Sequence, residues 1–344
     1  SESLSSAKVE INGEPIAASK QSSDTDGTQW EAVTQNPFIS DAEEVSFQIA
    51  EYVDLAGNPS SEALTTSDDN LKKVRIDVAA ATIMTTALST DNELADTDPG
   101  DEHKYLAKDG DTITLKFSTS EPLSSAKVEI NGETIPASKQ SGDMDGTQWE
   151  AVTQNPFSSD ADEVSFRIAE YVDLAGNSSS ETPTTSDDNS NKIRIDVGQP
   201  AITPSSVAIS TDNELAGTDP DDSLKYLAKS EDAITLKFST SEPLSSAEVK
   251  INEETIAASK QSSDTDGTQW EAVTQNPFSS DADEVSFQIA EYVDLAGNPS
   301  SEDPRTGDDN SKKIRIDLSK PTITPSSVAI STDNDLGGID PVDP

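Results

Sequence analysis

Aspartate and asparagine recur in this chain at fixed places where their oxygens could bind a cation. An aspartate ends the repeated segment Arg-Ile-Asp, and an Asp-Asn pair follows 14 or 16 residues later; these residues are Asp77, Asp196 and Asp317, then Asp91–Asn92, Asp212–Asn213 and Asp333–Asn334. A second acidic group comes next and contains Asp98, Asp101, Asp219, Asp221, Asp222, Asp340 and Asp343. Ca²⁺ binds 6–8 such oxygens at roughly 2.3–2.6 Å. We hypothesise that Ca²⁺ bridges these groups where one repeat meets the next, and the alternative is that they form solvated turns.

Three further motifs carry acidic residues. The segment Asp-Leu-Ala-Gly-Asn begins at Asp54, Asp173 and Asp294, where the aspartate either caps a turn or reaches a cation. Ser-Glu-Pro contains Glu121 and Glu242, which either bind a cation at a domain end or stay solvated. Asp-x-Asp-Gly occurs at 24–27, 143–146 and 264–267 but lacks the later ligands of a helix–loop–helix calcium site. We therefore predict that this last motif is a hairpin loop.

Charge and composition exclude several classes of protein. The 344 residues include 66 acidic and 23 basic ones, a net charge of −43, with no Cys and one His. Such a polyanion repels nucleic acid, and no apolar run approaches the ~20 residues needed to cross a bilayer. The lack of Cys excludes disulfides and thiolate metal sites, and a single His argues against imidazole-rich sites. We also expect no enzyme, because each candidate acid recurs two or three times whereas an active site is usually single.

A long repeat organises the chain. The segment DGTQWEAVTQNPF occurs three times, with Trp30, Trp149 and Trp270 at spacings of 119 and 121 residues. Helical and leucine-rich solenoid repeats run ~20–45 residues, so each unit here has the size of a domain. We predict complete repeats at 79–197 and 198–318, a repeat at 1–78 that lacks its first strands, and the start of another at 319–344.

Alternating apolar residues predict strands that position these acids. In the repeat 198–318 we expect seven strands with a period of two and no convincing helix; they cover 205–210, 232–240, 247–252, 255–259, 269–274, 284–292 and 312–317. Asn12–Gly13 and Asn131–Gly132 predict tight hairpin turns. We therefore expect an all-β protein of tandem immunoglobulin-like β-sandwich domains, about seven strands each, arranged end to end as a rod.

The motifs resemble a known family. The run ITLKFSTSEPLSSAEVKIN, the tryptophan, YVDLAGN, IRID and a proline-containing junction are similar to the tandem bacterial immunoglobulin-like extender repeats of giant calcium-dependent (RTX-type) surface adhesins. That resemblance covers the whole chain. It implies a secreted bacterial cell-surface protein, in which calcium at the junctions stiffens a rod that projects a distal binding domain.

The expected function is thus a structural spacer for cell adhesion or biofilm formation. Its expected partners are calcium ions and neighbouring repeats of the same chain, with no nucleic acid and no membrane insertion. The alternative is that the repeats themselves form an interaction module or a self-associating extracellular filament. Binding surfaces normally diversify or expose aromatic patches, whereas these repeats differ by few changes, which favours the spacer.

Overall fold

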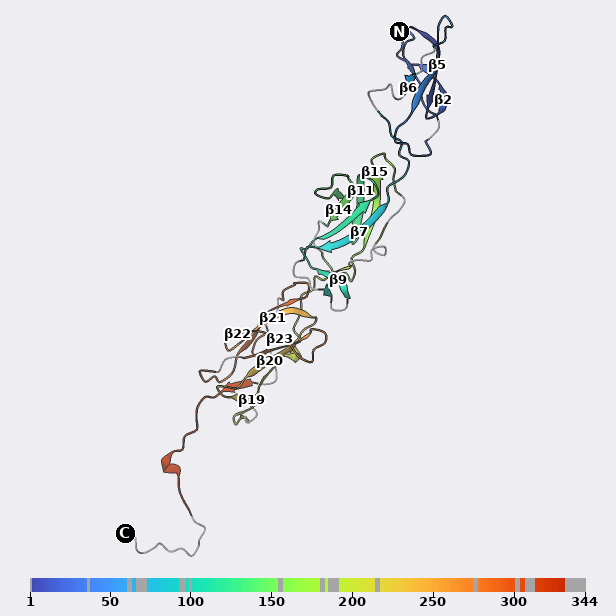
Figure 1. Ribbon diagram of the computed structural model, residues 1–344. Coiled ribbons are helices and arrows are strands. Elements are labelled where there is room, and N and C mark those ends of the chain that lie inside the picture. Colours follow the sequence, from blue (N-terminus) through green and yellow to red (C-terminus); the bar gives the residue numbers. More distant parts are fainter. Residues whose placement is uncertain are drawn as a thin grey trace, which may run out of the picture. The chain divides into compact units, whose positions relative to one another are not determined.

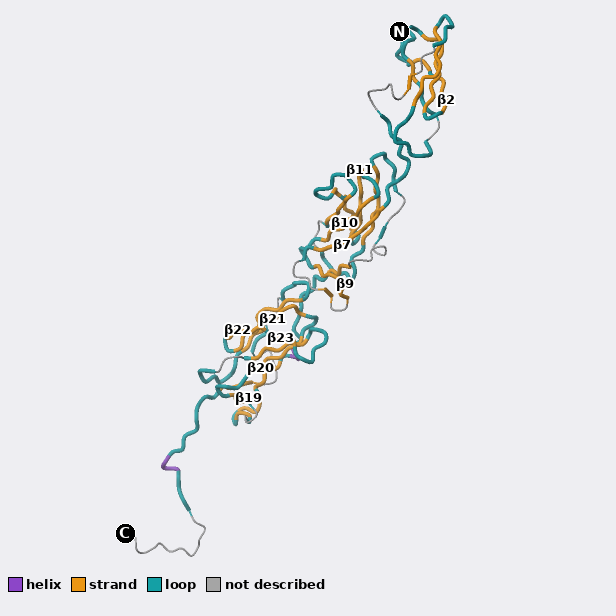
Figure 2. Tube along the Cα trace, in the orientation of Figure 1, coloured by secondary structure: helices purple, strands orange, loops and turns teal. Residues whose placement is uncertain are grey.

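The computed structural model describes residues 2–35, 38–60, 64–65, 73–92, 97–98, 101–153, 157–179, 183–184, 192–213, 217–274, 278–300, 304–306 and 313–331; at 97–98 and 101–103 it describes the backbone alone. The chain divides into two compact units, Ser1–Val197 and Gly198–Pro344. Within the described residues the secondary structure is strand, apart from the short 3₁₀ turns η3 (Pro204–Ser206) and η4 (Pro325–Ser327) (Figure 2).

The complete repeat of the first unit is a β-sandwich (Figure 1). Its strands are β7 (Ile83–Thr90), β8 (Thr97–Asp98), β9 (Asp101–Ala107), β10 (Ile113–Thr119), β11 (Leu123–Ile130), β12 (Glu133–Pro136), β13 (Ser138–Lys139), β14 (Gln148–Val152), β15 (Phe166–Asp173) and β16 (Lys192–Ile195). They form sheets in the orders β13-β14-β10-β7, β12-β11-β15 and β16-β9-β8. One core holds the sheets together.

The core follows from the alternation of apolar residues along each strand. In β10, Ile113, Leu115 and Phe117 are buried, while the residues between them face outwards. They pack in one cluster with Val128 and Ile168 from the facing sheet. Burying each such side chain contributes roughly 1.5–3 kcal/mol, which allows a core of this size to form without disulfides.

The first repeat has its own counterpart of the β12-β11-β15 sheet. Its strands are β1 (Leu4–Ile11), β2 (Glu14–Ala17), β3 (Ser19–Lys20), β4 (Trp30–Glu31), β5 (Phe47–Asp54) and β6 (Leu64–Thr65), with the sheet order β2-β1-β5-β6 and a separate β3-β4 pair. Leu4 pairs with Asp54 as Leu123 pairs with Asp173. Trp30 is half-buried whereas Trp149 is buried, because no counterpart of β10 covers it among the described residues 2–78.

The second unit contains a repeat of the same type. Its strands are β17 (Ala208–Thr211), β18 (Thr218–Asp219), β19 (Asp222–Ala228), β20 (Ile234–Ser239), β21 (Leu244–Ile251), β22 (Glu254–Ala257), β23 (Ser259–Lys260), β24 (Gln269–Val273), β25 (Phe287–Asp294) and β26 (Lys313–Ile316). The sheets run β17-β20-β24-β23, β22-β21-β25 and β18-β19-β26. The predicted all-β class and tandem immunoglobulin-like sandwiches are confirmed.

One long strand was not predicted. In the second unit, β19 pairs parallel with β26, so that Tyr226 lies opposite Ile314. The segment DSLKYLA has no period of two, and its exposure pattern shows only Ala228 fully buried. This strand forms because it covers the edge of β26, a long-range pairing that local sequence does not report.

The predicted hairpin turns require a left-handed backbone. Asn131 and Gly132 have φ values of +49° and +83°, as a two-residue turn between twisted strands needs. The third repeat keeps Asn252 but places Glu253 at φ +68°, a conformation that side chains with a Cβ rarely adopt. The pattern of the sheet therefore imposes this turn even where the favoured glycine is replaced.

Among the described residues, we find no helix with the length and apolar character that crossing a membrane requires.

Candidate metal centre

Three acidic side chains of the first unit lie close together at the end of the complete repeat where the first repeat joins it. Asp77, Glu121 and Asp173 each offer a carboxylate oxygen, and these oxygens lie within 4.8 Å of one another. Asp77 follows Ile76, whose bridge to Ala42 is the last pairing of the first repeat. Glu121 lies in the turn between β10 and β11, and Asp173 ends β15. Because β10 and β15 run in the same direction, their ends bring these two residues to one end of the domain.

Asp173 is fixed by the turn that it caps. Its Oδ1 accepts the amides of Gly176 and Asn177 at 2.7 and 2.9 Å, and its Oδ2 accepts Nδ2 of Asn177 at 2.9 Å. Burial, which leaves Asp173 1% exposed, acts to raise the pKa of its carboxyl, but these hydrogen bonds prevail and the pKa is lowered. The turn thus holds a buried carboxylate in its ionised form, which is the form that binds a cation.

Glu121 differs from Asp173 in that its surroundings raise its pKa. The residue before it is anchored to the start of the repeat, since Ser120 N donates to Thr82 O and Thr82 N donates to the Ser120 hydroxyl. Burial raises the pKa of Glu121, and the nearby carboxylates of Asp77 and Asp173 raise it further. An ionised Glu121 here repels its neighbours, so the cluster is a place where a positive ion relieves strain.

The residues fit a divalent cation of the hard, oxygen-binding class. Two oxygens bound to one Ca²⁺ are separated by at most about 5 Å, twice the usual ligand distance, and the three carboxylates already satisfy this limit. Their charge excludes an anion. Asp77, Glu121 and Asp173 would hold such an ion, which would supply charge neutralisation rather than chemistry.

The motifs that supply Asp77, Glu121 and Asp173 recur elsewhere in the chain, and the predicted residues at the equivalent positions have the following surroundings. Asp54 accepts Asn58 N and Nδ2, both at 2.8 Å, and its pKa is lowered chiefly by these bonds. Asp294 accepts the same two groups of Asn298 at 2.8 Å and is buried. Asp196 follows β16 and pairs with Arg194 at 3.2 Å, while Glu242 lies in the turn between β20 and β21.

The expected grouping of Asp77 with the Asp-Asn pair at Asp91 and Asn92 is corrected. Asp91 accepts Thr112 N at 2.6 Å and Oγ1 at 2.9 Å, and Asn92 N donates to the Thr90 hydroxyl. Between Asp77 and Asp91 lies the whole of β7, and a strand rises about 3.3 Å per residue. The two aspartates therefore belong to opposite ends of the domain.

The second unit repeats this arrangement at its own Asp-Asn pair. Asp212 accepts Ala233 N at 2.8 Å, and Asn213 N donates to the Thr211 hydroxyl. Asp212 thus connects the end of β17 to the start of β20 within a single domain. Asp333 and Asn334 lie outside the described residues.

The second acidic group has a different partner. Asp219 is buried, its Oδ2 accepts Arg315 Nη1 at 3.1 Å, and its Oδ1 accepts Asp221 N at 2.9 Å. The Asp221 amide first, then Arg315, lowers the pKa of Asp219. In the backbone register, Asp98 of β8 lies opposite Asp101 of β9. Asp317, of the first acidic group, accepts Ser319 N on its Oδ1 at 2.9 Å. Asp219 thus has a cation of its own chain beside it.

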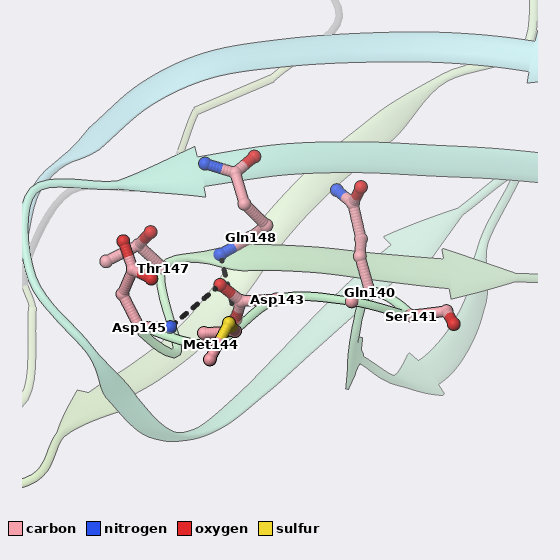
Figure 3. Close-up of a pocket in the computed structure, with 8 residues that line it drawn as sticks. Gln140, Ser141, Asp143, Met144, Asp145, Thr147 and Gln148 are labelled. Carbon is pink, nitrogen blue, oxygen red and sulfur yellow. Dashed lines mark hydrogen bonds between the residues drawn. The ribbon is translucent and has the colours of Figure 1, made fainter.

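The Asp-x-Asp-Gly motif forms a loop between β13 and β14, as predicted. Figure 3 shows the Asp143 carboxylate turned into the loop, where it accepts the amides of Asp145 at 3.3 Å and Gln148 at 3.4 Å. The adjacent Trp149 Nε1 donates to Gly146 O at 3.0 Å, and Lys139 Nζ lies 6.0 Å from its ring centroid. The carboxylate is used to close the loop, and the tryptophan is used in packing.

Sequence reasoning singled out all three clustered residues but did not group them. The missing step was strand direction, because Ser-Glu-Pro follows β10 and Asp-Leu-Ala-Gly-Asn ends β15 at the same end of the sandwich. Asn177 was missed as a hydrogen-bond partner of residues 77–79, which link the first repeat to the second. Its position in a repeated motif was visible, but a contact across about 100 residues was not.

Comparisons with known proteins find only distant similarities. No protein-family model matches the chain, and a search of curated proteins found no match. One similar structure is the Bacteroides ovatus mixed-linkage glucan utilization locus SGBP-B in complex with mixed-linkage heptasaccharide; it is 11% identical over 92% of this chain and 60% of that chain, with a TM-score of 0.16. Another is Dpr2 Ig1-Ig2 in complex with DIP-Theta Ig1-Ig3, 8% identical over 67% of this chain and 99% of that chain, with a TM-score of 0.21. The assignment of the fold rests on the strand orders above.

Proposed function

We propose that this chain is an extender region of a large secreted bacterial surface adhesin, a spacer whose repeats are stiffened by Ca²⁺. The observation that carries the proposal is the group of three carboxylates, Asp77, Glu121 and Asp173, contributed by the end of one repeat and the base of the next. An ion bound there joins two repeats through their charges. Without the ion, the mutual repulsion of the carboxylates favours separation of the two repeats at this junction.

The near-identity of the repeats supports a spacer over an interaction module. Repeats of nearly the same sequence supply length, and the same three residue types recur in sequence at Asp196, Glu242 and Asp294. Ca²⁺ fits better than Mg²⁺, because an irregular set of carboxylates suits its flexible coordination whereas Mg²⁺ demands a near-ideal octahedron. The distal ligand and the attachment to a cell belong to parts of the adhesin beyond these repeats.

Calorimetric titration of the chelated chain with Ca²⁺ tests the proposal. We expect saturable binding in the wild type and the loss of one bound ion in Glu121→Gln, which removes one negative charge from the cluster. Asp109→Asn is the matched control, because Asp109 is exposed in a turn of the same domain and lies outside the cluster. An unchanged stoichiometry in Glu121→Gln, or no binding by the wild type, would contradict the proposal.

The alternative function is self-association into a filament. Sedimentation of the Ca²⁺-loaded chain over a wide range of concentrations distinguishes the two. A spacer stays monomeric, since its ions lie between repeats of one chain, whereas a filament-forming module sediments faster as the concentration rises.

A further inference from the structure

The linker between the first two repeats is bound from both sides by groups that need no metal. On the side of the first repeat, Val78 N donates to Asp41 Oδ1 at 2.8 Å. On the other side, Asn177 Nδ2 donates to Asp77 O at 3.0 Å and to Ala79 O at 3.1 Å. The three consecutive linker residues therefore make hydrogen bonds to two different repeats.

Asn177 is itself fixed before it reaches the linker. Its backbone amide donates to Asp173 Oδ1, and its Nδ2 also donates to Asp173 Oδ2 at 2.9 Å. The amide group thus offers two hydrogens to three acceptors, one in its own turn and two in the linker. Neither aspartate nor serine can do this, because an ionised carboxylate has no hydrogen and a hydroxyl has only one.

The same contacts determine where Asp77 lies. Asp77 O is bonded to Asn177, Val78 N is bonded to Asp41, and Asp173 is both the anchor of Asn177 and a member of the carboxylate cluster. The peptide after Asp77 is therefore held by groups of two repeats, and the peptide before it is held by Ala42 N, which donates to Ile76 O at 2.9 Å. Placing that side chain beside Glu121 and Asp173 in advance reduces the ordering cost of binding an ion.

We propose that Asn177 is a latch that holds the linker residues 77–79 against the second repeat in the absence of metal and so positions Asp77 for the cation. This role as a positioning residue rests on the proposed function only for its effect on Ca²⁺ affinity. The ordering of the junction in chelator is independent of it.

Spin-label distance measurements test the latch directly in the full chain. The sequence has no Cys, so Ser19→Cys and Ser138→Cys, on exposed positions of β3 and β13, label one site in each repeat. With chelator, we expect a broader distance distribution in Asn177→Ala than in the wild type. With Ca²⁺, both distributions narrow, but Asn177→Ala requires about tenfold more Ca²⁺, as the loss of one or two net hydrogen bonds implies.

The first repeat supplies the matched control. Asn58 makes the same two bonds to Asp54 that Asn177 makes to Asp173, and its described hydrogen bonds are confined to that turn. Asn58→Ala therefore removes the local bonds without the linker bonds and should leave the distribution unchanged. Asn177→Asp keeps the size of the side chain but cannot donate and sets a second carboxylate beside Asp173 Oδ2, so it should broaden the metal-free distribution as Asn177→Ala does.

The two proposals fail in different ways. Equal widths for wild type, Asn177→Ala and Asn177→Asp in chelator would overturn the latch whatever the chain does with Ca²⁺. A wild type that binds no Ca²⁺ would overturn the proposed function, while a broadened metal-free distribution in both Asn177 variants would still support the latch.

Discussion

At the scale of single residues, similar aspartates in this chain serve different purposes. Asp91 and Asp173 both accept backbone amides at 2.6–2.9 Å, yet only Asp173 faces other carboxylates. Sequence shows that both residues are acidic and repeated, but the identity of the donors depends on which strand ends come together. This is why the residue types of the site could be predicted while their grouping could not.

Asp91→Asn should weaken the second repeat without affecting cation binding. Bonds from Thr112, first its amide, lower the pKa of Asp91. The stabilisation is therefore present above its ordinary pKa and is lost as the pH falls through the lowered folded value. We expect the free energy of unfolding at neutral pH to fall by about 1 kcal/mol, with a flatter dependence on pH in the acid range. Calorimetric unfolding between pH 2 and 7 measures both, and the loss of a bound Ca²⁺ would show that Asp91 is a ligand after all.

Glu253→Gly should stabilise the third repeat. Glu253 has a φ of +68°, which costs a residue with a Cβ roughly 1–2 kcal/mol and a glycine almost nothing. The expected gain in the free energy of unfolding is about 1 kcal/mol, visible as a higher melting temperature of one calorimetric transition. The reciprocal change, Gly132→Glu, should lower the transition of the second repeat, and a neutral result for both would mean that the turn relaxes.

At the scale of elements, the period of two in the sequence predicted the central strands well. Phe117 and Phe238 lie opposite Trp149 and Trp270 in matching register, as their alternating neighbours require. The strand β19 was not predicted, because its pairing with β26 joins residues that are far apart and has no local pattern. Local alternation indicates which face of a strand is buried, whereas the pairing of β19 with the distant β26 leaves no such pattern in the sequence.

Phe117→Ala should unfold its own repeat far more readily than the others. Phe117 is 1% exposed at the centre of the core, and a Phe-to-Ala change in such a place costs about 3–5 kcal/mol. Each complete repeat has a separate core, so the transition of residues 198–318 should stay where it is. Lys116→Ala, at the exposed neighbouring position, is the control. A shift of every transition by the same amount would show instead that the repeats unfold as one.

At the scale of the whole molecule, the net charge of −43 acts on every repeat at once. Self-repulsion destabilises compact states, and salt weakens it because the Debye length falls from about 30 Å at 0.01 M to about 3 Å at 1 M. General screening and binding at the carboxylate cluster therefore both predict stabilisation by added ions. The two effects differ in whether a variant that lacks a carboxylate of the cluster is still stabilised by Ca²⁺.

Glu121→Gln combined with Glu242→Gln should separate these two effects. Burial and two nearby carboxylates raise the pKa of Glu121, so at neutral pH its ionised form opposes folding, and this penalty disappears as the pH falls towards the ordinary value of a glutamate. In chelator, the double variant should melt at or above the wild-type temperature, and both should be stabilised alike by NaCl. Ca²⁺ at the same ionic strength should stabilise only the wild type further, since an ion bound only by the folded state acts by mass action. Equal responses to Ca²⁺ would mean that calcium acts on this chain merely as a screening salt, because removing one of the three carboxylates would weaken the binding of a specific ion.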